Sequence, residues 1–438
     1  MMIKPFLSAI CFSLLLATVP VQAAQQPAQD TAFHEQYQLQ KMLILSRHNI
    51  RSPIGTKLNK ITPHKWVTWT SAPGELSLRG GQLETIMGQY FRKRLVADGL
   101  IAENEQPKEG EVRFYANSLQ RTIATAQYFS SGMLPVANVP IEHHAALGTM
   151  DPVFNMRFGF MNDAYHAKAM EQIAAIGGTR GFDGINDRLA ESYRIIDEVL
   201  DYQTQPVTKK TVEEGLPKGP FNVILEQGHS PYSVNYRKAE YLASDALVLQ
   251  SYEEPNDERA AFNHKLTQKD WQAISNVKDT GIEVLCGTPL VAMNIAHPLL
   301  QVMHDELALD NRKFTFLCGH DTNLASVLAA LDVAPYTLPQ SIERNTPIGA
   351  KFVIEKWHGR DGQDYASLTL VYQSSEQLRN RTMLSLDTPP MIFPLTLKGL
   401  TKNADGLYRF RDVQQRFQTL LEAYDQLANE TTSAEKAA

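Results

Sequence analysis

The sequence predicts an α/β fold, with a central mixed sheet that is flanked by helices and interrupted by a mostly helical inserted cap domain. Three segments far apart in the chain share one pattern, in which a short strand-like run leads through a polar loop into a stretch with helical spacing. The strand-like runs are 42–45, 112–116 and 314–318. Because open α/β sheets bind ligands beyond the carboxyl ends of their strands, the three loops predict one shared site.

The loop after the first run carries two arginines around a histidine. It reads Ser-Arg-His-Asn-Ile-Arg-Ser-Pro over residues 46–53. Arg47 and Arg51 keep their charge at ordinary pH, whereas His48 between them can be neutral. Such a set can hold a phosphoryl dianion while a neutral ring nitrogen attacks phosphorus. The alternative is a basic turn whose arginines point into water.

The loops after the other two runs carry groups that suit the same anion. His320 and Asp321 follow the third run and precede the helical stretch 324–331, whose N-terminal amides would face a bound anion. Arg121 lies in the first turn of the helix after the second run, where a cation opposes the helix dipole unless an anion compensates it. Simpler alternatives are a helix-capping turn for the first pair and a solvent-facing side chain for the arginine.

Two of these motifs together resemble the signature of the histidine acid phosphatase family, which is Arg-His-Gly-x-Arg-x-Pro near the N-terminus and a distant His-Asp pair. Residues 47–53 carry the first half, and His320-Asp321 is the second. Asn49 stands where the family more often has glycine, and asparagine at this place is typical of the bacterial periplasmic glucose-1-phosphatases. Further resemblance to that subgroup lies in the segments 73–76, 80–81, 118–122, 148–152, 249–253 and 346–349.

The resemblance implies a phosphoglycerate-mutase-like fold and a reaction through a phosphohistidine. It makes His48 the nucleophile and Asp321 the general acid. It assigns the clamp on the phosphoryl oxygens to Arg47, Arg51, Arg121 and His320. The arginines should lower the pKa of His48 and keep Asp321 ionised, and activity should favour acid conditions. The scheme needs no cofactor, and no metal is expected because no Cys/His cluster with ligand spacing is present.

The resemblance also gives Glu253 a contact with the sugar of the substrate. A carboxylate at the pocket mouth would accept hydrogen bonds from sugar hydroxyls and repel additional phosphates, which favours monophosphorylated sugars such as glucose 1-phosphate. Glu254 is equally acidic, so an exposed acidic turn before Pro255 is the alternative. Phytase activity on inositol hexakisphosphate stays open, because relatives of this type can also remove a phosphate from phytate. The middle region 163–244, where substrate choice would be set, matches the subgroup weakly.

The N-terminus has the features of a secretory signal peptide. A positive start at 1–4 precedes a mostly apolar stretch at 6–19 and a small-residue cleavage site at 21–23. We therefore expect residues 1–23 to be removed and the product to be periplasmic. An uncleaved membrane anchor is the alternative, but the apolar stretch is shorter than the roughly 20 residues that a bilayer requires.

Composition limits the partners. The 42 basic and 48 acidic side chains give a net charge of −6, without a basic tract for nucleic acid. We expect a small-molecule phosphate monoester as the partner, with no nucleic acid and no membrane, and the sequence leaves the oligomeric state open. Cys286 and Cys318 remain after cleavage, and they either pair or stay buried thiols.

The order of the patterns predicts a catalytic core in two parts. The core is expected at 24–149 and 280–429, the helical insertion at 150–279 and a disordered tail at 430–438. Within the core we expect a helix from Ser77 to about Asp98, strands at 350–357 and 366–372, and a final amphipathic helix that includes 417–427.

Two other functions share some of these features. A phosphoglycerate-mutase-like enzyme also forms a phosphohistidine, but it would be expected in the cytoplasm and would take its acid from a glutamate elsewhere. A periplasmic phosphate-ligand binding protein would be exported too. It has no need, however, of a histidine between two arginines or of a paired acid such as Asp321.

Overall fold

A computed structural model describes residues 31–55 and 57–437 of the chain, so the predicted signal peptide at 1–23 lies outside the described residues. The strands are β1 (Tyr37–Arg47), β2 (Val112–Ala116), β3 (Asn222–Ile224), β4 (Tyr232–Val234), β5 (Phe314–Gly319), β6 (Lys351–Gly359), β7 (Asp364–Tyr372), β8 (Met391–Pro394) and β9 (Tyr408–Arg409). The helices are α1 (Thr31–Gln36), α2 (Leu78–Ala97), α3 (Gln120–Met133), α4 (Asp163–Ala175), α5 (Phe182–Arg188), α6 (Ala190–Leu200), α7 (Pro206–Glu214), α8 (Lys238–Glu253), α9 (Asp257–Ala260), α10 (Gln268–Cys286), α11 (Pro289–Ile295), α12 (His297–Ala308), α13 (Asp321–Ala330), α14 (Ser375–Asn380) and α15 (Phe410–Ala437). Within these described ranges, no helix is both long enough and apolar enough to cross a membrane.

Seven strands form the central sheet, in the order β2-β5-β1-β6-β7-β8, with β9 paired to β7. The strands β1, β2 and β5 run parallel and the other pairs are antiparallel, which confirms the predicted mixed sheet. Arg47 pairs with Gly319, and Ala116 pairs with Cys318, so the three parallel strands end level with one another. The three polar loops therefore leave the same end of the sheet.

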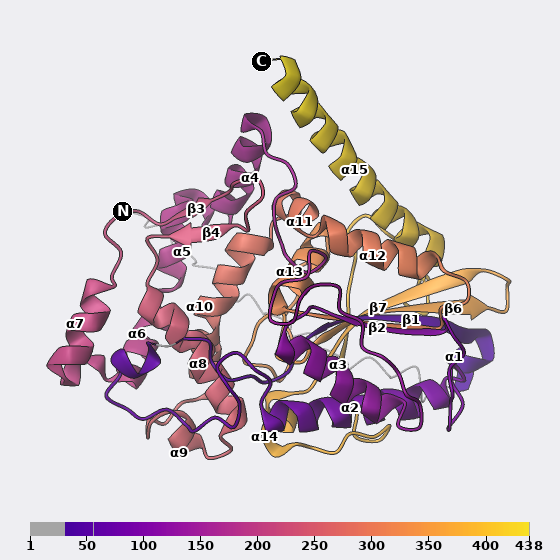
Figure 1. The fold of residues 1–438 in the computed structure, drawn as a ribbon, viewed down its shortest axis with the longest axis horizontal. Coiled ribbons are helices and arrows are strands. Elements are labelled where there is room, and N and C mark those ends of the chain that lie inside the picture. Colours follow the sequence, from indigo (N-terminus) through magenta and orange to yellow (C-terminus); the bar gives the residue numbers. More distant parts are fainter. Residues whose placement is uncertain (1–30, 56, 438) are drawn as a thin grey trace, which may run out of the picture.

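Helices cover both faces of this sheet (Figure 1). Because side chains alternate along a strand, Ile44 of β1 packs in one apolar cluster with α2 and α3, whereas Leu45 packs in another with α12, α13 and α15. The helices α2 and α3 approach very closely, since a Cβ atom on Gly88 would lie 2.2 Å from the carbonyl oxygen of Phe129. The sheet is thus held between two apolar layers, and its polar loops are free to form a site at its end.

The stretch 150–279 is mostly helical, as the sequence predicts, and it lies beside the sheet in Figure 1. Its helices share one apolar cluster with the segment between β1 and α2, and this cluster includes the fully buried side chains of Ile50, Ile196 and Leu247. The antiparallel pair β3 and β4 within it was not expected. The helix α10 runs without a break across the predicted boundary at 279, so that boundary stays a prediction.

The C-terminal segment differs from the predicted disordered tail at 430–438. The helix α15 continues to Ala437, and residue 438 lies outside the described residues. Thr431 gives the reason, because its hydroxyl is buried and accepts a 2.6 Å hydrogen bond from the side-chain amide of Asn162, the N-cap of α4. A tertiary contact therefore extends the helix beyond the end of its amphipathic pattern.

Of the two alternatives for Cys286 and Cys318, the structure has buried thiols. Neither sulfur takes part in a disulfide. Burial raises the pKa of both thiols, so they are protonated and unreactive at ordinary pH.

Candidate active site

Backbone hydrogen bonds join the three loops at the end of the sheet. The amide of His48 donates to the carbonyl oxygen of Gly319 over 3.0 Å, and the amide of Asn117 donates to Cys318 over 2.9 Å. These bonds continue the parallel pairing one residue past the strands. As a result, the rings of His48 and His320 lie edge to face, with their centroids 5.4 Å apart.

His48 has the environment of a neutral nucleophile. Its ring is buried, and its Nδ1 lies 2.8 Å from the carbonyl oxygen of Asn49. Since a carbonyl oxygen can only accept, Nδ1 carries the proton and Nε2 keeps its lone pair. Burial, followed by the positive charge of Arg121, holds the pKa of His48 well below its ordinary value.

His320 is neutral for the same reasons. Burial and the charge of Arg121 lower the pKa of His320 to about 3. Its Nε2 accepts a 2.7 Å hydrogen bond from the side-chain amide of Asn117, and the oxygen of that amide accepts from the backbone N–H of Asp151. This second bond fixes which way the amide faces, so the orientation of the His320 ring is fixed too.

Of the three predicted clamp arginines, Arg121 is the one that most needs an anion. Burial, together with the charge of Arg51, lowers the pKa of Arg121 to about 10. Arg121 donates only a 3.3 Å hydrogen bond to the carbonyl oxygen of Gly74, and its buried Nε has no partner in the part of the chain that the structure describes. Arg51 forms an ion pair with Asp245 of α8, at 3.0 and 3.2 Å. A phosphoryl group between the two arginines would relieve their repulsion.

Arg47 differs from the other predicted clamp residues, because protein groups already surround its guanidinium. Its Nη1 donates to Glu343 over 2.5 Å and to the carbonyl oxygen of Thr346 over 2.6 Å, and its Nη2 lies 3.3 Å from Asp321. Burial alone would lower the pKa of Arg47, but the two acids outweigh it and raise it. Arg47 therefore holds the carboxylate of Asp321 in place.

Asp321 begins α13, where the helix dipole favours a negative charge. Its Oδ2 lies 3.3 Å from Arg47 and 3.4 Å from the ammonium group of Lys278, and its Oδ1 accepts from the amide of Thr322. Burial alone would raise the pKa of Asp321, yet the charges of Arg47 and Lys278 outweigh burial and hold it well below the ordinary value. The acid is ionised before a substrate arrives.

Three charged residues of this site carried no sequence signal. Lys278 lies on α10 and Asp245 on α8, both in the helical insertion, and Glu343 lies in the loop before β6. None of them follows a strand, so the pattern that revealed the other residues does not include them. Lys278 also contacts Glu343 over 3.1 Å, which links the insertion to the core through buried charges.

A buried network below His48 accounts for the asparagine in the first motif. The side-chain amide of Asn49 donates to Glu84 over 2.7 Å, and Lys351 forms an ion pair with the same carboxylate at 3.1 Å. Gly349 has a φ of +67°, and a Cβ atom on it would lie 2.6 Å from Asn49 Nδ2. Where the family more often has glycine, Asn49 thus adds a side chain whose hydrogen bond to Glu84 anchors the loop on α2.

Glu253, the predicted sugar contact, lies at the end of α8. Its carboxylate accepts a 2.8 Å hydrogen bond from the hydroxyl of Ser77, which caps α2. Asp245, the partner of Arg51, is eight residues earlier on the same helix, which corresponds to about 12 Å along the axis. The structure brings the other six predicted residues together around the loops, and the contact between Glu253 and a sugar stays a prediction.

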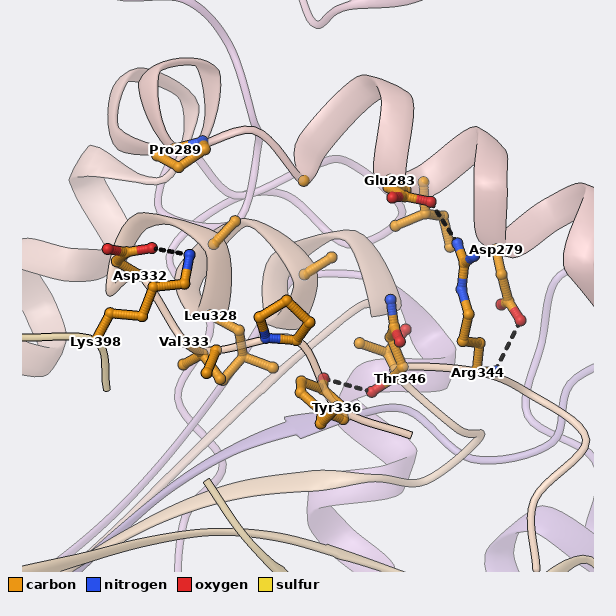
Figure 2. A pocket seen from close by; sticks show the side chains of 17 residues that line it. Asp279, Glu283, Pro289, Leu328, Asp332, Val333, Tyr336, Arg344, Thr346 and Lys398 are labelled. Atoms are coloured by element: carbon orange, nitrogen blue, oxygen red, sulfur yellow. Dashed lines mark hydrogen bonds and ion pairs between the residues drawn. The ribbon is translucent and has the colours of Figure 1, made fainter. Parts of the chain in front are cut away.

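A pocket of about 360 Å³ lies between α10, α13 and the loop that follows α13 (Figure 2). Its charged side chains pair with one another, Arg344 with Glu283 and Lys398 with Asp332. Its lining includes none of the seven predicted site residues. Thr346, whose carbonyl oxygen accepts from Arg47, does line it, so this pocket adjoins the predicted site without being part of it.

Comparison with known proteins agrees with the geometry. The family described as histidine phosphatase superfamily (branch 2) matches residues 24–373. Glucose-1-phosphatase of Salmonella typhimurium is 36% identical over 412 residues, which cover 92% of this chain and 96% of that protein. Phytase AppA of Escherichia coli is 30% identical over 425 residues, which cover 92% and 94%.

Among solved structures, the phytase from Citrobacter braakii has a similar fold. The TM-score is 0.78 at 25% sequence identity, over 88% of this chain and 98% of that chain. The mixed sheet with its flanking helices is shared, which confirms the predicted fold class.

Proposed function

We propose that this chain, which belongs to the histidine phosphatase superfamily (branch 2), hydrolyses sugar monophosphates such as glucose 1-phosphate in the periplasm. It is a histidine acid phosphatase that is similar to glucose-1-phosphatases. One observation carries the proposal: a buried His48 with a lowered pKa lies within electrostatic reach of Arg51 and Arg121, and the buried Nε of Arg121 has no hydrogen-bond partner in the described part of the chain. The periplasmic part rests on the predicted signal peptide at 1–23.

In the first step, Nε2 of His48 attacks the phosphorus of the bound ester. A phosphohistidine forms while the bond between phosphorus and the sugar oxygen breaks. Arg51 and Arg121 stabilise the charge on the phosphoryl oxygens, and this is where most of the rate enhancement of phosphoryl transfer arises. The hydrogen bond from Nδ1 to the carbonyl oxygen of Asn49 keeps the attacking nitrogen aimed at the clamp.

The departing sugar oxygen needs a proton, which Asp321 supplies. The free site keeps Asp321 ionised, but a phosphate dianion beside it offsets the charges of Arg47 and Lys278 and raises the pKa of the carboxyl group. Acid conditions then complete its protonation. In the second step, Asp321 takes a proton from water as the water oxygen attacks phosphorus, which releases phosphate and regenerates His48.

Substrate preference is the finer part of the proposal. Asp245 places a carboxylate directly against the clamp residue Arg51, and Glu253 lies farther along the same helix. Two acids on one wall favour a substrate with hydroxyl groups around a single phosphate, since additional phosphates would meet like charge. This arrangement supports a hexose monophosphate over a highly phosphorylated inositol.

Phytase activity is the second candidate, and the likeness to the phytases of Escherichia coli and Citrobacter braakii favours it. The two candidates share the chemistry at His48 and differ only in the rest of the substrate. A direct comparison of kcat/KM for glucose 1-phosphate and for phytate near pH 5 separates them. A clear preference for phytate would overturn the sugar-phosphate proposal and leave the phosphohistidine mechanism in place.

The mechanism is tested at His48. Rapid quenching with base during turnover of a ³²P-labelled ester should leave base-stable, acid-labile label on the unmutated enzyme, as expected for a phosphohistidine. His48→Ala should carry no label and should lose about three orders of magnitude or more in kcat, because nothing else in the site accepts the phosphoryl group. Label that persists in His48→Ala would contradict the assignment, and so would full turnover of p-nitrophenyl phosphate.

A further inference from the structure

A second cluster of polar side chains lies where the segment between β1 and α2 meets the helical insertion, and it consists of His64, Asp201 and His264. The Nε2 atom of His64 lies 2.8 Å from Oδ2 of Asp201, and Nε2 of His264 lies 3.0 Å from the same oxygen. The three potential ligand atoms all lie within 4.8 Å of one another. The proposed catalytic scheme makes no use of these residues. No motif in the sequence points to them, because 137 and 63 residues separate successive members.

Two imidazole nitrogens and one carboxylate oxygen are a set of ligands that suits Zn²⁺ and its neighbours in the periodic table. Such metals bind nitrogen and oxygen at about 2.0–2.2 Å, so tetrahedral ligand atoms lie roughly 3.3–3.5 Å apart. The distances of 2.8 and 3.0 Å from Asp201 Oδ2 to the two imidazole nitrogens are somewhat shorter, so they need to lengthen only slightly to admit the ion. The side chains of the three residues are 28%, 37% and 32% exposed, which leaves a fourth position open to water.

Contacts outside the cluster hold the ligands in place. The amide of His64 donates to the hydroxyl of Thr62, and that hydroxyl donates to the carbonyl oxygen of Leu200, the residue before Asp201. The ring of His64 stacks on Phe262 at 4.8 Å and 17° between planes. Asp201 has a φ of +47°, the left-handed conformation that ends α6 and turns its side chain away from the helix. A site organised in this way loses little conformational entropy when an ion binds.

We propose that His64, Asp201 and His264 form a binding site for a divalent transition metal such as Zn²⁺. The three residues come from the loop between β1 and α2, from the end of α6 and from the loop between α9 and α10. The first of these segments begins directly after the catalytic loop. The ion therefore joins the core to two parts of the insertion, and its role is to stabilise their arrangement and not to take part in phosphoryl transfer.

Binding is measured on the mature enzyme at about pH 7.5, where unpaired histidines are neutral. Isothermal titration with Zn²⁺ should show one site, and Co²⁺ should give the visible absorption of a four-coordinate nitrogen and oxygen site. The double variant His64→Ala/His264→Ala should weaken Zn²⁺ binding by about a hundredfold or more and abolish the Co²⁺ spectrum. Zinc should also raise the Tm of the unmutated enzyme and leave that of the double variant unchanged.

Two controls separate this site from other histidines. The double variant His143→Ala/His229→Ala removes two exposed histidines outside the cluster and should keep the Zn²⁺ affinity. His48→Ala should keep it as well, because the metal does not bind in the active site. No binding of Zn²⁺ to the unmutated enzyme would overturn the proposal, and so would equal affinity in the His64/His264 variant. In the latter case the three residues form only a hydrogen-bonded cluster.

Discussion

The neighbours of Asp321 set the pKa of its carboxyl group, and one of them, Lys278, belongs to the helical insertion and not to the core. The ammonium group of Lys278 lies 3.4 Å from the carboxylate of Asp321 and is one of the charges that lower its pKa. A general acid works only while it carries its proton, so in the proposed mechanism this cation helps to set the pH above which the leaving group is no longer protonated. Lys278 would then be a positioning residue that acts through Asp321.

Lys278→Gln should therefore shift the alkaline limb of the kcat profile for glucose 1-phosphate upward by about one pH unit, because the pKa of Asp321 rises when the charge is removed. The limb for p-nitrophenyl phosphate should move less, since its phenolate leaves without a proton. Lys269→Gln, an exposed lysine on the same helix, is the control and should leave both profiles unchanged. Unshifted limbs in Lys278→Gln would show that the lysine has only a structural role.

Substitutions of Asp245 and Glu253, two acids of α8, should change substrate choice in different ways. Asp245→Asn should raise the ratio of kcat/KM for phytate to that for glucose 1-phosphate by about tenfold, because a charge that repels additional phosphates disappears beside Arg51.

If Glu253 contacts the sugar, Glu253→Gln should lower kcat/KM for glucose 1-phosphate about tenfold and spare p-nitrophenyl phosphate. Equal losses on both substrates would instead assign Glu253 to the support of Ser77 at the start of α2.

At the scale of elements, the loop after β1 is fastened to α2 through Asn49 and Glu84. Asn49→Ala should lower the free energy of unfolding by about 1–3 kcal/mol, because a buried carboxylate loses one of its two side-chain partners. Urea denaturation measures this change. Asn59→Ala, at an exposed asparagine in the same inter-element segment, should stay within about 0.5 kcal/mol of the unmutated protein. A loss in Asn49→Ala no larger than that of the control would show that the network does not stabilise the loop.

The sequence predicted the elements that carry their own local pattern. Arg47, His48, Arg121 and His320 each lie in or next to a polar loop that follows a strand-like run and precedes a stretch with helical spacing. These residues could therefore be found from the local sequence pattern alone. Lys278, Asp245 and Glu343 could not, because they reach the site from helix faces and loops whose neighbours are ordinary. The extension of α15 past its amphipathic part was missed for a similar reason, since it depends on the contact of Thr431 with Asn162.

At the scale of the whole molecule, the active site makes stability depend on pH. His48 and His320 have folded-state pKa values below 6.5, so between about pH 6.5 and pH 3 the unfolded chain binds protons that the folded chain does not. Their contribution to stability is complete above pH 6.5 and is lost as the pH falls through this window. Asp321, whose pKa is also depressed, adds a loss of the same sign below about pH 4.

The free energy of unfolding should therefore decrease on acidification by up to about 1.4 kcal/mol per pH unit for each histidine. Urea denaturation at several pH values between 6.5 and 4 measures the slope. His320→Asn removes one of the two titrating groups and should make the slope shallower, whatever its effect on stability at pH 7. His143→Ala, at an exposed histidine, should leave the slope unchanged. An unchanged slope in His320→Asn would contradict the burial of a neutral ring at that position.

The contact between Lys278 and Asp321 also bears on how such enzymes can diverge or be recombined. If Asp321 is the general acid, a chimaera that takes residues 150–279 from a relative would keep the pH limit of leaving-group protonation only if the donor segment supplied a cation at the place of Lys278. In the proposed mechanism, the reaction in the core therefore constrains the residue at the position of Lys278 in the insertion. A graft designed to change the substrate should keep α10 from the recipient and exchange only the segment before it.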